Sequence, residues 1–524
     1  MEDLYILSDL HLGEGRSRDS LRFSRLEVFF YDQELSNFVD RVLVEAMATR
    51  TPARLILNGD VFDFLTVTRL PTAPELREQG MRLHRSEHKF GLSTTARKSA
   101  WKLGRIIAGH PTFFRAILRF AAAGHPVTIL RGNHDAELFW DTVRDRFFAE
   151  LDAIVAAEDL ALPPPVLRER VRFEHWFYLE PGRIWVEHGH QYEASNSFRY
   201  NLNPVLPSRY SDAGAEVLDY PTGSLFVRNV YNKVKLVDPY SNYYVSLDQY
   251  MGIVGSANFF AMARTFGLHL PFFMRAIRDA RFFELHGMEE IAATHQARLE
   301  DEARRNELDP ALLHQVDALM VEPVGKTKYS LIQEMLRPFA RSTAAVTVIG
   351  LLSIAGWFLV FTLIQSTGWI VSGILSKAWL MALFAVVTVT GLFVFLMWVH
   401  QRVAIGATLD ATGDTCYDRA ERIAELVGVP LVSMGHTHRP DLRPFRRVPG
   451  RYANSGTWIL NRSASDAIKP KSRQFTFVRV KGLEMDILRW DDAGRRWEPV
   501  PLLEDYRPSP FERLLGEDDA EELP

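Results

Sequence analysis

The chain has 524 residues, 47% of them hydrophobic, so it is long enough for two or more structural units and too apolar for wholesale disorder. The net charge of −4 gives no global positive field, so nucleic acid is not an expected partner. Cys416 is the only cysteine, which excludes an intramolecular disulfide and fits a reducing compartment, and the first residues lack the apolar leader of a cleaved signal peptide.

Short apolar segments alternate with helical patterns in the first part of the chain. We expect strands at residues 4–7, 55–57, 127–130, 184–186 and 431–434, and helices at residues 35–47 and 113–123. Such alternation is typical of α/β layers around a sheet. Near the C-terminus, residues 475–480 and 483–490 flank Lys481-Gly482 and predict a β-hairpin, which we expect in a second sheet of the same domain.

A polar motif follows each of the five predicted strands. The motifs are Asp9-Leu10-His11, Gly59-Asp60-Val61-Phe62-Asp63, Gly132-Asn133-His134-Asp135, His188-Gly189-His190 and Gly435-His436-Thr437-His438. Open α/β sheets place their sites at the carboxyl ends of strands, so we expect the five motifs to meet on one edge of one sheet. Within Asp9–His11 and His436–His438, residues two apart point to the same side of an extended backbone.

These residue types match the ligands of a two-metal site. Carboxylate, imidazole and amide oxygen suit hard-to-borderline divalent ions, and two adjacent ions can activate a water and neutralise charge on a phosphoryl group. Each motif alone is more often structural than metal-binding, but five in this order are hard to explain by coincidence. Hydrolysis of a phosphate ester is therefore the leading hypothesis.

Together the motifs resemble the calcineurin-like metallophosphoesterase superfamily, over residues 1–195 and 425–490. The resemblance implies an α/β fold built as a four-layer α/β/β/α sandwich, with two divalent ions such as Mn, Fe or Zn as cofactors. The implied ligands of the first ion are Asp9, His11, Asp60 and His438, and those of the second are Asp60, Asn133, His188 and His436. It further implies that Asp60 bridges the ions, that His134 stabilises or protonates the leaving oxygen and that Asp135 orients His134.

In motif style the chain is most similar to the UDP-2,3-diacylglucosamine hydrolase branch, whose members cleave a lipid-linked pyrophosphate. It departs from that branch at His134, where the branch has arginine, and at His190, where it has aspartate. A phosphomonoester, a phosphodiester and a pyrophosphate, lipid-linked or not, are all candidate substrates. The alternatives are a general phosphatase or phosphodiesterase acting on a soluble or protein substrate and, from another class, a non-catalytic metal-binding membrane scaffold.

Several other polar residues have two interpretations each. Asp63 either caps the turn after Asp60 or binds metal, and His190 and Glu193 either support the ligands or join them. A set of basic residues can either grip substrate phosphate or form a solvated surface; it comprises Arg16, Arg18, Arg22, Arg25, Arg82, Arg85, Lys89, Arg97, Lys98 and Lys102.

A long insertion separates the fourth motif from the fifth. Residues 344–364 and 378–399 are uncharged and long enough to span a bilayer, so we expect a two-helix transmembrane hairpin, with a buried hairpin as the alternative. Flanking arginines orient both termini toward the cytoplasm. The predicted protein is thus a multi-pass protein of the cytoplasmic membrane whose catalytic domain faces the cytoplasm. Its domains are a catalytic domain in two parts (1–195 and 425–495), a helical insertion or lid (196–424) and an acidic tail (496–524).

Overall fold

In this computed structural model the described residues are 1–17, 22–206, 216–232, 289–324, 411–459 and 474–500, with a few isolated positions between 356 and 385. The chain divides into two compact units, and the first consists of Met1–Tyr243, Met288–Pro323 and Thr412–Pro524. The sheets and their covering helices belong to this first unit.

The larger sheet has seven strands in the order β14-β13-β12-β1-β2-β3-β4. The strands are β1 (Asp3–Leu7), β2 (Ala53–Asn58), β3 (Val127–Leu130), β4 (Val171–Glu174), β12 (Thr476–Lys481), β13 (Glu484–Asp491) and β14 (Arg496–Pro499). Strands β1 to β4 are parallel, whereas β12 to β14 extend the sheet in antiparallel fashion beyond β1. The parallel strands read as nearly continuous apolar segments because both faces of this sheet are covered.

The smaller sheet has five strands in the order β10-β11-β9-β6-β5. They are β5 (Phe177–Glu180), β6 (Ile184–Glu187), β9 (Leu431–Met434), β10 (Pro440–Pro444) and β11 (Arg451–Ser455). Strands β6, β9 and β11 are parallel, and the two edge strands are antiparallel to their neighbours. A two-stranded sheet of β7 (Val205–Leu206) and β8 (Val217–Leu218) lies apart from both.

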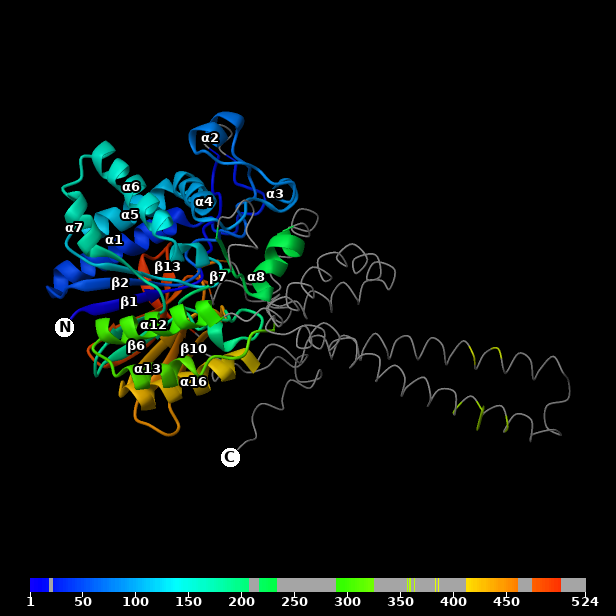
Figure 1. Cartoon of the computed structure of the whole chain (residues 1–524). Helices are drawn as coiled ribbons and strands as arrows, with labels where there is room; N and C mark the ends of the chain where they lie inside the picture. The colour runs from blue at the N-terminus through cyan, green and yellow to red at the C-terminus, as the bar shows by residue number, and fades with distance from the viewer. Residues whose placement is uncertain are drawn as a thin grey trace. The chain divides into compact units, whose positions relative to one another are not determined.

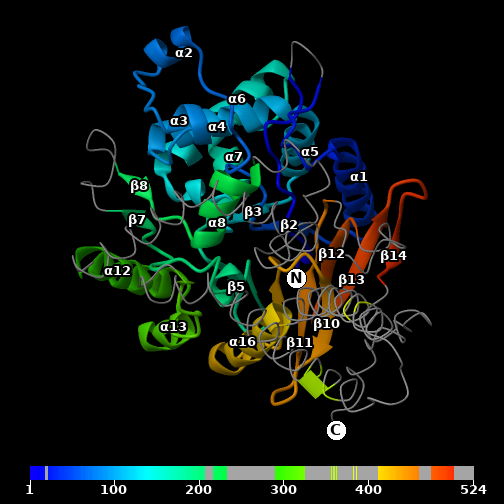
Figure 2. The same ribbon diagram turned by 90° about the vertical axis from the view of Figure 1, so that its right-hand side faces the viewer.

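Helices cover the outer faces of the two sheets, which pack against each other (Figures 1 and 2). One apolar cluster joins Leu4 and Ile56 of the larger sheet to Val186 and Leu431 of the smaller one. The larger sheet is covered by α1 (Asp32–Thr49), α4 (Ala96–Gly109), α5 (Pro111–Ala122), α6 (Asp141–Ala157) and α7 (Pro164–Arg170). The smaller sheet is covered by α12 (Glu289–Arg305), α13 (Pro310–Asp317) and α16 (Ala411–Val427). The shorter helices are α2 (Ala73–Glu78), α3 (Glu87–Phe90) and α8 (Thr222–Phe226).

All five strands and both helices predicted from the alternating pattern are present. The C-terminal hairpin is also present as β12 and β13, with Gly482 in the left-handed turn between them. Its assignment to a second sheet is wrong, because β12 pairs with β1 in the larger sheet. The alternating apolar residues Val478 and Val480 of β12 are buried in the cluster between the sheets, on the same side as Leu4 and Ile6.

The structure corrects the predicted transmembrane hairpin. Among the described residues, no helix is both long enough and apolar enough to cross a membrane. A span needs about 20 predominantly apolar residues, whereas α1 has 18 residues and carries charged residues along its length. The predicted fold class, which included such a hairpin, is therefore corrected to an α/β fold with mixed sheets. The predicted multi-pass membrane localisation is wrong for the same reason. The segments 344–364 and 378–399 themselves lie outside the described residues, apart from isolated positions, as does the acidic tail from residue 501 onward.

A buried ion-pair group fixes the loop that follows the first motif. Glu27 accepts hydrogen bonds from the backbone amides of Gly13 and Gly15 in this loop, and its Oε2 lies 3.4 Å from Nε2 of His110. On its other side, Nδ1 of His110 lies 3.1 Å from Asp32. Burial alone would lower the pKa of His110, but the Asp32 and Glu27 carboxylates raise it to about 9.

We expect this group to make stability depend on pH in the alkaline range. The pKa of His110 is raised above its unfolded value of about 6.5, so its contribution is complete below that pH and is lost as pH rises through about 9. The wild type should therefore exceed His110→Gln in unfolding free energy by up to about 3 kcal/mol near pH 6. Urea titrations at several pH values measure this gap; an equal gap near pH 6 and pH 10, about one unit above the raised pKa, would contradict the assignment.

Candidate metal centre

The five motifs converge at the carboxyl ends of strands from both sheets. Asp9 and His11 follow β1, Asp60 follows β2, and Asn133 follows β3, all in the larger sheet; His188 follows β6, and His436 and His438 follow β9, in the smaller one. The expectation of one edge of one sheet is therefore wrong. The site lies where the ends of two packed sheets meet, because β6 and β9 present their carboxyl ends beside those of β1 to β3.

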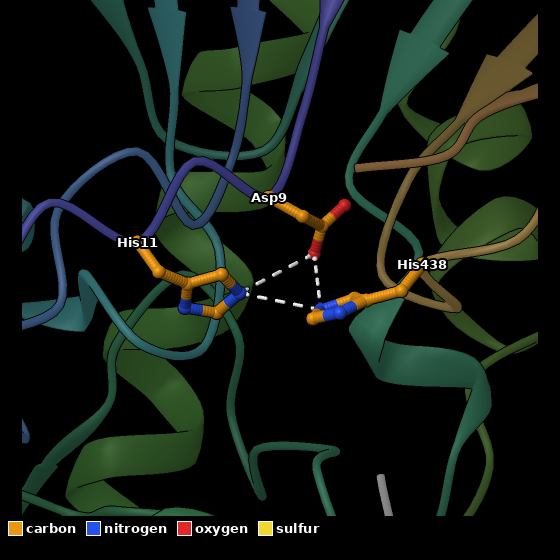
Figure 3. A group of neighbouring side chains, drawn as sticks. All are labelled: Asp9, His11 and His438. Atoms are coloured by element: carbon orange, nitrogen blue, oxygen red, sulfur yellow. Dashed lines mark hydrogen bonds and ion pairs between the residues drawn. The ribbon is translucent and has the colours of Figure 1, made fainter. Parts of the chain in front are cut away.

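One group of possible metal ligands consists of Asp9, His11 and His438. Oδ1 of Asp9 lies 3.1 Å from Nε2 of His438 and 3.8 Å from Nε2 of His11. The two imidazole Nε2 atoms are 3.2 Å apart. Figure 3 shows the three side chains pointing toward one another. Oδ2 of Asp9 accepts a hydrogen bond of 2.9 Å from the amide of His436, which leaves Oδ1 directed at the two histidines.

A second group consists of Asp60, His188 and His436. Oδ2 of Asp60 lies 3.4 Å from Nε2 of His188, and Nδ1 of His188 lies 2.9 Å from the carbonyl of Asn58, which fixes the ring. The same Oδ2 lies 3.9 Å from Nε2 of His11 in the first group. Asp60 thus stands within reach of both groups, and its Oδ1 is held by the amide of His134 at 2.8 Å.

Asn133, the expected amide ligand of the second ion, follows β3 and has a side-chain oxygen that no described residue satisfies. Its side chain is buried, and its Oδ1 has no hydrogen-bond partner among the described residues. Its Nδ2 makes a 3.4 Å hydrogen bond to Oδ1 of Asn196, which sets the orientation of the amide. A buried amide oxygen without a partner is costly unless something else satisfies it. This oxygen therefore fits a metal ligand, and the donor set of carboxylate, imidazole and amide fits divalent ions.

Five of the seven candidate ligands adopt a backbone conformation that L-residues rarely occupy. The φ angles are 54° for Asp9 and His11, 50° for Asp60, 69° for His436 and 57° for His438. The extended backbone expected for the paired motifs is therefore not what aligns them. Non-glycine residues with positive φ cost free energy and cluster where function requires the geometry.

Asp135 and two glycines fix the loops around Asp60. The buried Asp135 carboxylate accepts hydrogen bonds from the amides of Val61 at 2.9 Å and Gly132 at 2.6 Å. A Cβ on Gly132 would lie 2.2 Å from Oδ1 of Asp60, so only glycine fits there. A Cβ on Gly435 would lie 2.9 Å from Oδ2 of Asp9. The glycine of the third motif is therefore required by the close approach of Asp60. That of the fifth motif is required chiefly by Ser8, whose Oγ and Cβ would lie 2.5 and 2.6 Å from such a Cβ.

Asp63, rather than Asp135, is the carboxylate beside His134. Oδ1 of Asp63 lies 3.3 Å from Nδ1 of His134, and its Oδ2 lies 3.8 Å from Nδ1 of His11. Oδ1 also accepts hydrogen bonds from the amides of Leu65 and Thr66, so Asp63 caps this turn as well. From the sequence, capping the turn and binding metal were alternative roles for Asp63, although its position three residues after Asp60 was visible. Only the fold shows that the turn brings Asp63 under two histidines.

Glu193 and His190 line the far side of the second group. Oε2 of Glu193 lies 2.7 Å from Nε2 of His436, which leaves Nδ1 of that ring for an ion. His190 is buried, its ring centroid is 5.5 Å from that of His188, and neither ring nitrogen has a hydrogen-bond partner in the described part of the chain. Glu193 thus supports a ligand, the simpler of its two interpretations.

The charges of the cluster suit a cation. Burial raises the pKa of Asp9, but His438 lowers it by more. The resulting pKa is about 2, so this carboxylate is ionised. Burial together with His134 lowers the pKa of His11 to about 3, which keeps the imidazole in the neutral form that binds metal. Burial lowers the pKa of His188, yet Asp60 raises it to about 10. Binding of a divalent ion to His188 would displace this proton.

The basic residues considered for phosphate binding do not form one surface. Lys98 and Lys102 are buried; Nζ of Lys98 pairs with Glu87 at 2.5 Å, and Nζ of Lys102 lies 3.6 Å from Glu137. Arg18 lies outside the described residues. Arg16 lines a separate cavity. Lys102 is thus part of the support beneath the loop that carries Asp63, because it also donates to the carbonyl of Phe64.

No family model matches the chain, and no curated protein matches it. The class of protein therefore has to be argued from the fold and the side-chain groups. These show His and Asp groups that can hold metal ions at the junction of two sheets.

Proposed function

We propose that the protein is a two-metal phosphoesterase of the calcineurin-like type, which hydrolyses a phosphomonoester, phosphodiester or pyrophosphate bond. Its cofactors would be two divalent ions such as Mn, Fe or Zn. One observation carries the proposal: Oδ2 of Asp60 lies 3.4 Å from Nε2 of His188 and 3.9 Å from Nε2 of His11. A carboxylate shared between two ligand groups is what a pair of adjacent ions requires.

The residues would divide into two sets of ligands. Asp9, His11 and His438 would hold one ion together with Asp60, and Asn133, His188 and His436 would hold the other together with Asp60. Two bound ions would lower the pKa of a water between them and neutralise charge on the phosphoryl oxygens. Their protein ligands come from loops fixed by backbone hydrogen bonds, so the donors are already in position before substrate binds.

His134 would transfer the proton in this reaction. Its ring centroid lies 4.6 Å from that of His11, so it stands beside the metal ligands. Oδ1 of Asp63 lies 3.3 Å from Nδ1, so Nε2 would be the nitrogen for exchange with substrate. Protonation of the leaving oxygen by a positioned imidazole is general acid catalysis.

A generic substrate tests the proposal. The purified full chain, given Mn²⁺ and an aryl phosphodiester or phosphomonoester, should release the aryl alcohol, and a chelator should stop the reaction until Mn²⁺ is restored in excess. A protein that binds Mn²⁺, Fe²⁺ or Zn²⁺ but hydrolyses neither ester, nor pyrophosphate, would be a metal-binding protein without this activity, and the proposal would fail.

A further inference from the structure

A cavity of about 350 Å³ lies away from the candidate metal ligands, between the loop after the first motif and three helices. Its lining comes from Arg16 and Ser17 of the loop, from α2, α4 and α6, and from Arg69, which precedes α2. Figures 1 and 2 both place α2, α4 and α6 on the same side of the larger sheet. Candidate metal ligands do not contribute to this lining.

The cavity carries more positive than negative charge. Its lining has four guanidinium groups, from Arg16, Arg69, Arg105 and Arg146, against the carboxylates of Glu75 and Glu150. Arg146 is paired with Glu150 at 2.5 Å. Glu75 closes the N-terminal cap of α2, where its Oε2 accepts hydrogen bonds from the amide and hydroxyl of Thr72.

Two of the arginines are left without a carboxylate partner. Within the described part of the chain, Arg16 and Arg69 form no ion pair. Arg105 interacts electrostatically with Glu75, but its Nε is buried without a hydrogen-bond partner among the described residues. Arg16 instead lies over the ring of Phe23, with its guanidinium carbon 4.8 Å from the ring centroid. Like charges gathered around one cavity repel one another unless an anion lies between them.

We propose that this cavity binds the diphosphate group of a small molecule. Guanidinium groups match phosphate oxygens in a bidentate geometry. A diphosphate has oxygens for several guanidinium groups at once, whereas a simple carboxylate has only two. The cavity volume lies at the lower end of the range of about 300–1,000 Å³ for small-molecule sites, so it exceeds what a single phosphate requires. Trp101 supplies an aromatic wall against which a base can pack.

The same loops build the cavity and the metal centre. Arg16 follows His11 in the chain, and Arg69 follows Asp60 and Asp63. Oε1 of Glu14 accepts hydrogen bonds from the amides of Thr68 at 2.9 Å and Arg69 at 2.8 Å, which ties the two loops together beside the cavity. The diphosphate site does not rest on the proposed hydrolysis, since its residues and its readout are separate.

Calorimetric titration of the full chain with two hydrolysis-resistant probes tests this site. The probes are methylenediphosphonate, which stands for free diphosphate, and α,β-methylene-ADP, which stands for a nucleotide. Wild type should bind at least one probe, and Arg69→Gln and Arg105→Gln should each weaken that binding about 10- to 100-fold, as expected for loss of a charged hydrogen bond. Ala108→Leu should weaken it without a change in charge, because Ala108 lines the cavity.

The matched control is Arg77→Gln, an exposed arginine of α2 outside the cavity lining, which should bind as wild type does. Arg69 is itself exposed, so Arg69→Gln should fold, and thermal unfolding checks this. Equal affinity for both probes would indicate that the site recognises the diphosphate alone. Tighter binding of α,β-methylene-ADP would indicate that it recognises a nucleotide, and either result supports the site. No binding by wild type, or wild-type affinity in folded Arg69→Gln and Arg105→Gln, would overturn it, whatever the result of the hydrolysis assay.

Discussion

Replacing Asp60 with alanine is expected to abolish Mn²⁺-dependent hydrolysis and to remove bound metal. Its Oδ2 is the atom within reach of both ligand groups, and its Oδ1 holds the amide of His134. Loss of this carboxylate should therefore weaken the binding of both ions and displace His134, the proposed proton donor. We expect the rate of aryl-ester hydrolysis to fall by at least about 10³-fold, comparable to removal of a central catalytic group. Metal content, measured by elemental analysis after dialysis, should fall with it.

Asp40→Ala provides the control for this experiment. Asp40 lies on α1, is partly exposed, and pairs with Arg119 at the surface. Its loss should leave both hydrolysis and metal content unchanged, since exposed ion pairs contribute about 0–1 kcal/mol. If folded Asp60→Ala kept two ions per chain and hydrolysed the ester at the wild-type rate, Asp60 would not be the shared ligand.

Asp63→Asn and Asp135→Asn are expected to have different defects, a lower kcat in the first and a lower unfolding free energy in the second. Asp63→Asn keeps an oxygen for the amides of Leu65 and Thr66 but loses the negative charge beside His134. At saturating Mn²⁺ its kcat should fall by about 10- to 100-fold, the effect typical of a group that orients a reacting side chain or a ligand. In combination with His134→Ala it should add little further loss, because the two residues act as a unit.

In Asp135→Asn the damage should fall on stability. Each carboxylate oxygen of Asp135 accepts at least one backbone amide, so an amide nitrogen on either side would face another donor. We expect a loss of about 1.5–3 kcal/mol in unfolding free energy, the value for a hydrogen bond to a charged group. Chemical denaturation measures it. A kcat defect in Asp135→Asn that is non-additive with His134→Ala, and none in Asp63→Asn, would instead assign the positioning of His134 to Asp135.

The sequence predicted the strands correctly and identified the motifs that the fold brings together, because both depend on local patterns. Each of β1, β2, β3, β6 and β9 is a short apolar segment, and a polar motif follows each at the strand's carboxyl end. Where a ligand such as Asp60 or His188 stands next to a buried strand, its position is nearly fixed by the strand itself. That locality is why the five motifs could be found from the sequence, whereas the choice of nine candidate site residues within them came from the family resemblance.

Contacts between distant segments could not be predicted in this way. Whether β12 joins β1 or another sheet depends on which apolar face it covers, and the sequence of a hairpin does not contain that partner. The transmembrane hairpin was predicted from hydropathy alone, and the described helices do not provide it. The cavity arginines likewise come from two loops and two helices whose approach no local pattern encodes.

The carboxylate beside His134 best illustrates the difference between what the sequence determined and what the tertiary structure decided. The sequence by itself determined that a histidine and two carboxylates lie near the metal ligands, because they stand within the same motifs. Only the tertiary structure decided which carboxylate serves the ring: backbone amides of Val61 and Gly132 surround Asp135, whereas Asp63 reaches His134 across the turn. Both carboxylates accept backbone amides, so the distinction is one of position: the fold places Oδ1 of Asp63 3.3 Å from Nδ1 of His134.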